Sequence, residues 1–345
     1  MQPSTMQAMV IEEHGGPLVL RELPVPEPGP GEVLLRVKAC AVDRFDLAIR
    51  KGSRERATLP HILGHEISGQ IAAVGPDVTD WTGGERVASS LYLVCGRCRW
   101  CLRGRETICE RFGGHVGVAI PGGYAQFTVL PARNLVQLPE SIDYPAGSIL
   151  ANAIGTPFHA LVARMQIRPG DRLVVTGAGG GVGVHAVQLG RMLGASVMGV
   201  DQGEDKLKAI VAQGAEAAVD SASEDLGAAI ADWTGGRGAD GVLELVGAAT
   251  MPMTLPGLAK GGRMVVVGSH TGDGFSFDPG LLFRNEWEIL GSRNVGVDEL
   301  ATVVDLVAAD KLSPVVAGTY PLSAAEDLQA RVAAGQVIGR DVLVP

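Results

Sequence analysis

One stretch limits the fold more than any other: the apolar run RLVVT is followed by the glycine-rich segment GAGGGVG and then by helix-like residues. A glycine-rich turn between a strand and a helix lets the backbone approach a phosphate group, and the N-terminus of the helix favours negative charge. The positions that match the fingerprint are Ala178, Gly180 and Gly183, with Gly181 and Val182 between them. This stretch predicts a strand–turn–helix unit that binds the pyrophosphate of a dinucleotide.

An acidic residue follows at the spacing that such a unit requires. Asp201 comes directly after the next apolar run, SVMGV, about 20 residues beyond the loop. A carboxylate there accepts hydrogen bonds from the ribose hydroxyls of NAD and repels the 2′-phosphate of NADP. NAD is therefore predicted over NADP. Lys206 follows five residues later; it is a candidate to cover the adenosine side, and otherwise a solvated charge.

The spacing of apolar runs along the 345-residue chain predicts regions of different architecture. Up to about residue 151, short β-type runs are broken by Pro and Gly, which predicts a mostly antiparallel β domain. From residue 152 to 292, strand-like and helix-like segments alternate, which predicts a parallel sheet covered on both faces. The remaining residues, 293–345, are expected to return to the first domain through the final strand, DVLVP.

The composition excludes several classes of protein. With 46% hydrophobic residues the chain can fill two cores, and a net charge of −9 argues against nucleic-acid binding. No apolar run is long enough to span a membrane, and the first residues have no export signal. We therefore expect a cytoplasmic protein that acts on a small-molecule substrate, with no nucleic-acid or membrane partner.

Four of the five cysteines form one dense cluster between residues 95 and 109. In a chain of this kind such clustering favours metal ligation over disulfides. Four thiolates from one short loop close a tetrahedral zinc site, with no open position for chemistry. The predicted ligands of this structural zinc are Cys95, Cys98, Cys101 and Cys109.

Taken together, these motifs resemble the medium-chain dehydrogenase/reductase superfamily, which contains the zinc alcohol dehydrogenases and their quinone reductase relatives. The resemblance rests on GHE at residues 64–66, the four-cysteine lobe, GGYAQFTVLPARNLVQLP, the GAGGGVG loop with Asp201, and the C-terminal GRDVLVP. It implies an α/β protein with a GroES-like β domain and a Rossmann domain, a doubly wound parallel sheet. It also implies a homodimer or homotetramer built through the Rossmann domain.

The resemblance also implies roles for single residues. Arg44 resembles the arginine that pairs with cofactor phosphate, Thr156 the threonine beside the nicotinamide, and Arg340 the late arginine that reaches the pyrophosphate. At the catalytic zinc the family uses a cysteine, a histidine and a further cysteine or acid. This chain has Asp43, His65 and Asn152 at those positions. Its proton relay is altered as well, since Phe45 and Ala48 replace the usual polar residues.

Two opposite interpretations of this altered site remain open. Asp43 keeps the negative charge of the lost thiolate, and Glu66 can replace the ligand that neutral Asn152 does not supply, so Asp43, His65 and Glu66 could hold a divalent ion. Alternatively the site holds no metal, as in relatives that reduce conjugated double bonds, and Asp43 or His65 handles a proton.

Three functions follow from these alternatives. The leading hypothesis is an NAD(H)-dependent oxidoreductase that moves hydride between nicotinamide and a small alcohol or carbonyl at a modified metal site. The second is a reductase of enones, quinones or acryloyl-type thioesters without catalytic zinc. The third, from another class, is a cofactor-binding protein without turnover.

Overall fold

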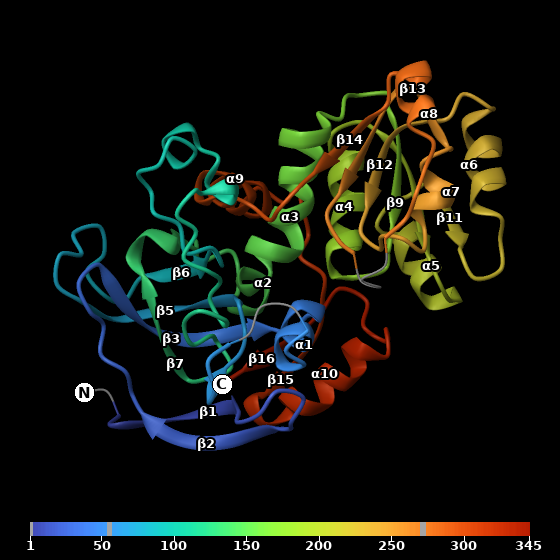
Figure 1. The fold of residues 1–345 in the computed structure, drawn as a ribbon. Coiled ribbons are helices and arrows are strands. Elements are labelled where there is room, and N and C mark those ends of the chain that lie inside the picture. The colour runs from blue at the N-terminus through green and yellow to red at the C-terminus, as the bar shows by residue number, and fades with distance from the viewer. Residues whose placement is uncertain (1–2, 54–56, 270–273) are drawn as a thin grey trace. The chain divides into compact units, whose positions relative to one another are not determined.

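The computed structural model describes residues 3–53, 57–269 and 274–345. The chain divides into two compact units (Figure 1). The first comprises Met1–Asn152, Val295–Asp310 and Pro314–Pro345, and the second comprises Ala153–Asn294 and Lys311–Ser313. Among the described residues, no helix is long and apolar enough to cross a membrane.

The first unit is built on two β-sheets. The larger has the strand order β15-β16-β3-β5-β6-β8 with β7 also paired to β3, and the smaller has the order β2-β1-β4. Every pairing is antiparallel except that of β15 with β16, as predicted for this half. The strands are β1 (Thr5–Ile11), β2 (Leu18–Pro24), β3 (Glu32–Ala41), β4 (His61–Ile62), β5 (Glu66–Val74), β6 (Arg86–Ser89), β7 (Phe127–Pro131), β8 (Leu135–Gln137), β15 (Val316–Pro321) and β16 (Arg340–Val344).

The C-terminal strand closes this sheet, because β16 pairs with β3 while β3 also pairs with β5. The apolar faces of these strands form a continuous core with residues from β1 and β7. The α-helices of this unit are α1 (Arg44–Arg50), α2 (Tyr144–Ser148), α9 (Val297–Ala308) and α10 (Ala325–Ala333). β3 runs directly into α1, so the end of a buried strand positions the start of that helix.

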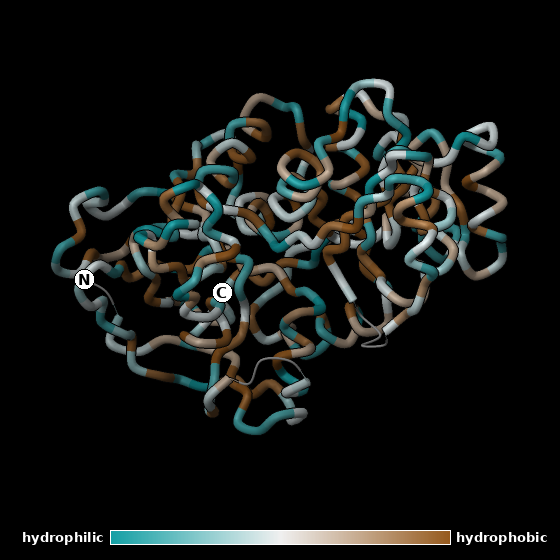
Figure 2. The backbone as a smooth tube through the Cα atoms, turned by 45° about the horizontal axis from the view of Figure 1, so that its top comes forward, coloured by the Kyte–Doolittle hydropathy of each residue, from teal (hydrophilic) through white to brown (hydrophobic). Residues whose placement is uncertain are grey.

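The second unit is a wholly parallel sheet with the strand order β11-β10-β9-β12-β13-β14. Its central strands are almost entirely buried, which explains why the sequence shows them as unbroken apolar runs. Figure 2 shows hydrophobic colour along these strands and hydrophilic colour in the loops. The strands are β9 (Arg172–Thr176), β10 (Ser196–Asp201), β11 (Ala217–Asp220), β12 (Ala239–Glu244), β13 (Leu258–Val266) and β14 (Glu288–Gly291).

Helices cover both faces of this parallel sheet. α4 packs on β9, β10 and α5, while α6 packs on β11 and α7, and α4 and α6 lie on opposite sides of the sheet (Figure 1). The α-helices of this unit are α3 (Gly155–Phe158), α4 (Gly181–Met192), α5 (Glu204–Ala212), α6 (Leu226–Thr234), α7 (Met251–Thr254) and α8 (Pro279–Asn285). The arrangement is a doubly wound α/β unit.

Candidate active site

The glycine-rich loop lies between the end of β9 and the start of α4, as the sequence predicts. Gly180 is the N-cap of α4. A Cβ atom on Gly183 would come 2.2 Å from the carbonyl oxygen of Gly177, so only glycine allows the helix to lie this close to the turn. The loop therefore leaves the helix N-terminus open to a pyrophosphate, as a dinucleotide requires.

Asp201 and Lys206 lie beside this loop. One carboxylate oxygen of Asp201 accepts a hydrogen bond from the Gly179 N–H at 2.8 Å. The other oxygen accepts from the Gln202 N–H at 2.9 Å and from Lys206 Nζ at 3.0 Å. A carboxylate has about four acceptor positions, so room remains for a ribose hydroxyl. Lys206 is paired with Asp201 and is not a freely solvated charge.

Of the three residues to which the resemblance gives a cofactor role, Thr156 and Arg44 lie in different units. Thr156, in α3, is buried and accepts a hydrogen bond from Asn294 Nδ2 at 3.1 Å. Arg44 is exposed at the first position of α1 and forms no ion pair among the residues that the structure describes. The contact of each with the cofactor stays a prediction.

Asp43 caps the helix that follows it. Its Oδ1 accepts hydrogen bonds from the backbone N–H groups of Phe45 and Asp46, at 2.8 and 3.1 Å. The side chain of Asp46 returns to the Asp43 N–H, which completes a capping box. A helix N-terminus prefers an anionic cap, so Asp43 has a structural function whether or not a metal is bound.

The four altered-site residues lie together in the first unit, around the side-chain amide of Asn152. Its Nδ2 atom lies 3.0 Å from Asp43 Oδ2, 3.2 Å from His65 Nε2 and 2.9 Å from Glu66 Oε1. Asp43, His65 and Glu66 are all buried. The amide nitrogen is thus surrounded by the same acceptor atoms that would coordinate a metal ion.

Arg340 neutralises part of the negative charge of this cluster. Its Nε donates to Glu66 Oε1 at 2.8 Å, and its Nη2 lies 3.6 Å from Asp43 Oδ2. The side chain of Arg340 is buried with them. The resemblance assigns Arg340 to the cofactor pyrophosphate, but in this structure it forms an ion pair with the cluster.

Asp46 and Tyr124 orient His65 from the other side. Asp46 Oδ1 lies 2.9 Å from His65 Nδ1, and the Tyr124 hydroxyl donates to Asp46 Oδ2 at 2.9 Å. Asp46 accepts from the Nδ1–H, while Nε2 lies 3.2 Å from Asn152 Nδ2 and 3.6 Å from Asp43 Oδ2, where it can carry the second proton of a charged imidazole. The sequence pattern does not single out Tyr124, although it lies within GGYAQF, one of the motifs that carry the family resemblance.

The charges shift the pKa values in opposite directions. Burial disfavours ionised Asp43, but His65 and Arg340 outweigh it and hold the pKa of Asp43 below its usual range. Burial also disfavours charged His65, but Asp43 and Asp46 raise its pKa well above the ordinary value. For Glu66 burial prevails over Arg340, so its pKa is raised. Asp43 is therefore the carboxylate that stays ionised.

A catalytic metal ion does not fit this arrangement as it stands. Ligand atoms of Asp43, Asp46 and His65 lie within 4.8 Å of one another, and their chemistry suits a divalent cation. However, the Asn152 amide already donates to Asp43 Oδ2 and Glu66 Oε1, and its nitrogen lies 3.2 Å from His65 Nε2, so an ion would have to displace it. One buried atom, Oε2 of Glu66, has no hydrogen-bond partner among the described residues.

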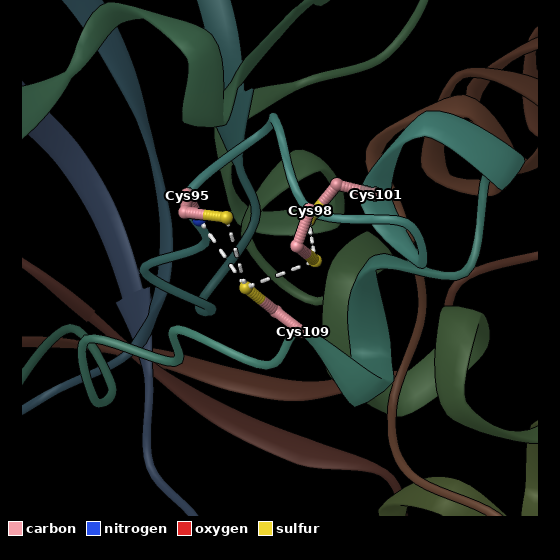
Figure 3. Close-up of side chains that lie close together, drawn as sticks. All are labelled: Cys95, Cys98, Cys101 and Cys109. Carbon is pink, nitrogen blue, oxygen red and sulfur yellow. Dashed lines mark hydrogen bonds between the residues drawn. The ribbon is translucent and has the colours of Figure 1, made fainter.

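The four cysteines of the lobe gather as a single cluster (Figure 3). The separations between neighbouring sulfur atoms are 3.5, 4.0 and 3.5 Å. Zinc–sulfur bonds of about 2.3 Å in a tetrahedron place sulfurs roughly 3.8 Å apart. Backbone N–H groups of Cys101 and Glu110 lower the pKa of Cys98 to about 6, whereas burial and the neighbouring sulfur atoms raise the pKa of Cys101 to about 12. The thiolate is therefore favoured at Cys98 and needs a bound cation at Cys101. The cluster is consistent with a structural zinc site.

Comparison with known proteins agrees with the fold and with the family that the sequence motifs resemble. Residues 29–140 match the alcohol dehydrogenase GroES-like domain, and residues 181–309 match the zinc-binding dehydrogenase domain. The NAD-dependent alcohol dehydrogenase of Sulfurisphaera tokodaii is 31% identical, over 99% of this chain and 100% of that protein. The acryloyl-coenzyme A reductase of Metallosphaera sedula is 30% identical, over 92% of this chain and 93% of that protein.

A solved structure is also similar over nearly the whole chain. The crystal structure of AibC superposes with a TM-score of 0.94 at 37% identity, and the match covers 99% of this chain and 96% of that one. The fold and these relatives thus define an alcohol dehydrogenase-like oxidoreductase. The chain belongs to the medium-chain dehydrogenase/reductase superfamily.

Proposed function

We propose that this oxidoreductase uses NADH to reduce a carbon–carbon double bond conjugated to a carbonyl, as in an acryloyl-type thioester, without a catalytic metal. The observation that carries this proposal is the position of Asn152 Nδ2, within hydrogen-bond distance of Asp43, His65 and Glu66. The two hydrogens of this amide can donate to Asp43 and Glu66, two carboxylates that would otherwise attract a cation.

The two reductions make different demands on the site. Reduction of an isolated carbonyl places negative charge on an oxygen beside the carbon that receives hydride, where a Lewis acid helps most. In a conjugate reduction the charge is spread over an enolate, and hydrogen-bond donors can stabilise it. A site without a firm metal ligand set is therefore better suited to the conjugated substrate.

The environment of His65 also supports this proposal. The ring of Phe45 stands edge-on to His65, with centroids 5.2 Å apart, and edge-on to His115 at 5.0 Å. An aromatic ring cannot relay a proton, so the hydroxyl relay of alcohol oxidation has no counterpart at this position. Of the two candidate proton donors, His65 with its raised pKa is preferred over ionised Asp43.

We further propose NAD(H) as the cofactor, held by the loop 177–183, Asp201 and Lys206, with contributions from Arg44 and Thr156. When bound, the cofactor supplies a hydride from C4 of its nicotinamide ring. Asp201 favours NAD because a carboxylate repels a 2′-phosphate, while the nearby Lys206 weakens that repulsion. A contribution of Arg340 to pyrophosphate binding belongs to the same proposal, although its guanidinium contacts Glu66.

Metal analysis combined with a substrate panel tests this function. We expect one zinc per chain, held by the cysteine lobe, and NADH-dependent reduction of acryloyl-coenzyme A or a simple enone. Oxidation of primary and secondary alcohols should be slower by orders of magnitude. A second metal in the purified protein, together with rapid turnover of an alcohol or ketone, would refute the proposal.

The second candidate is the alcohol–carbonyl couple with an ion held by Asp43, His65 and Glu66. The unpartnered Oε2 of buried Glu66 favours it, because a buried carboxylate oxygen without a partner is costly. The Sulfurisphaera tokodaii relative is named an NAD-dependent alcohol dehydrogenase, which suits this candidate. The same metal analysis separates the two.

Three further assignments belong to the proposal. The first unit, which differs by one or two residues from the predicted boundaries 1–151 and 293–345 and lacks Lys311–Ser313, is the catalytic domain, and the second unit, predicted as 152–292, is the cofactor domain. We propose a cytoplasmic protein that assembles as a homodimer or homotetramer through the cofactor domain. Light scattering on the purified protein tests the assembly, and a monomer at micromolar concentration would contradict it.

A further inference from the structure

The strand order of the second unit identifies a switch point between β9 and β12. From β9 the chain moves outward to β10 and β11, then returns to the other side of β9 as β12. In open α/β sheets, ligands bind at the carboxyl ends of the two strands where the order reverses. Thr176 ends β9 and Glu244 ends β12, so both residues lie at this point.

Glu244 is a fully buried carboxylate that gathers donors from several segments. Its Oε1 accepts hydrogen bonds from the hydroxyls of Thr176 and Thr250, each at 2.7 Å. The same atom accepts from the backbone N–H groups of Val246 and Gly247, each at 2.9 Å. Within the part of the chain that the structure describes, no basic side chain pairs with it. Such burial of a charge is costly unless the charge is fully hydrogen-bonded.

These bonds fix the turn that follows β12 against the glycine-rich loop. The Leu245 N–H donates to Thr176 Oγ1 at 2.9 Å. A Cβ atom on Gly177 would meet Val246 Cγ2 at 3.3 Å and Leu245 Cβ at 3.6 Å. The turn therefore touches the first residue of the loop, and Glu244 is the acceptor that holds the turn in this conformation.

We propose that Glu244 is a positioning residue for the nicotinamide half of the cofactor. This inference rests on the dinucleotide use proposed above. Asp201 ends β10, on one side of β9, where it is placed to read the adenosine ribose. In a dinucleotide bound across the switch point, the nicotinamide half lies toward β12, against the turn that Glu244 fixes.

The test compares two ligands that share the adenosine half. In a Glu244→Met variant, which keeps length but loses the acceptor, the Kd for NADH should rise about tenfold or more, equivalent to about 1.4 kcal/mol. The Kd for AMP should stay within about twofold, since AMP does not reach the turn. Glu244→Gln keeps an acceptor oxygen for the four donors, so it should restore NADH binding close to the wild-type value.

Thr254→Val is the matched control. The Thr254 hydroxyl lies 3.3 Å from Glu244 Oε2 and 3.2 Å from the Thr250 carbonyl oxygen, whereas the turn is held by Oε1. Its loss should therefore lower stability without changing the ratio of NADH to AMP affinity. If Glu244→Met does not fold, Thr250→Val removes one donor from Oε1 and should raise the Kd for NADH selectively.

An equal loss of NADH and AMP affinity, or a lowered Tm with an unchanged affinity ratio, would overturn the role of Glu244. Failure of the wild-type protein to bind NADH would instead overturn the proposed cofactor.

Discussion

The side-chain nitrogen of Asn152 donates a hydrogen bond to Glu66 Oε1 at 2.9 Å, at the centre of a buried group of acceptors. Glu66 is at the same time bound by Arg340. One neutral amide and one guanidinium thus contact the acceptor atoms that a metal ion would otherwise contact. The compensation of negative charge in this cluster therefore depends on an amide side chain at position 152.

Replacing this amide by a carboxylate should create a need for a cation. Asn152→Asp removes the donor and adds a negative charge beside Asp43 and Glu66. An uncompensated buried charge costs roughly 3–5 kcal/mol, so the Tm measured without added metal should fall. Added Zn²⁺ or Mn²⁺ should restore it, with one further metal per chain by elemental analysis.

Asn152→Leu is the control for that experiment. It also removes the donor but adds no charge, so it should be destabilised without any response to metal. An Asn152→Asp protein that keeps the wild-type Tm and binds no additional ion would show that the amide does not stand in for a cation in this cluster.

The preference for NADH should depend on Asp201. Asp201→Ser removes the carboxylate that repels a 2′-phosphate, so the affinity for NADPH relative to NADH should rise by about tenfold. Fluorescence titration of both cofactors measures this ratio. Lys206→Met is the comparison, because loss of the cation should lower NADPH affinity and leave NADH preferred. An unchanged ratio in Asp201→Ser would show that another group reads the ribose.

The cysteine lobe should account for a single zinc that is lost when one ligand is removed. Cys98→Ser should lower the zinc content by about one per chain, and zinc affinity should weaken at acidic pH because the thiols must lose protons to bind. Cys40→Ala is the matched control, since Cys40 is buried in the core of the first unit, apart from the lobe. Zinc retained by Cys98→Ser would place the metal elsewhere.

Asp341 should make the protein less stable at neutral pH than a neutral residue would. Its side chain is completely buried, and neither carboxylate oxygen has a hydrogen-bond partner among the described residues. Arg331 Nη1 approaches Oδ2 to 3.2 Å, yet burial prevails and raises the pKa of Asp341. Ionisation therefore lowers the free energy of unfolding as the pH rises from the unfolded pKa, about 3.9, to the folded pKa.

Asp341→Asn should accordingly be more stable than the wild type at pH 7, by roughly 1 kcal/mol, and the difference should shrink as the pH falls toward 4. Urea denaturation at several pH values measures it. Glu326→Gln should behave oppositely, because Arg50 and the Leu18 N–H lower the pKa of Glu326 despite its partial burial. Equal stability of Asp341→Asn and wild type at both pH values would refute the prediction.

The features that the sequence alone determined are those whose signal is short-range. The glycine-rich turn with Asp201 and the cysteine cluster each lie within about 25 residues of chain, and the alternation of apolar runs reports the burial of each strand directly. These patterns predicted the parallel sheet, the antiparallel unit and the cofactor loop. The capping box of Asp43 and Asp46 is equally local, since it lies within four residues at the start of α1, but it was identified only in the structure.

Only the tertiary structure decided which groups compensate the negative charge of the altered site. Arg340 lies 274 residues from Glu66 in the chain, and Asn152 lies 87 residues from His65. No local pattern reports such pairs, because their contact depends on how β16, β5 and the segment after α2 pack in the folded unit. The sequence named Asp43, His65, Glu66 and Asn152 as one site, and packing decided that an amide and a guanidinium supply donors to its acidic groups.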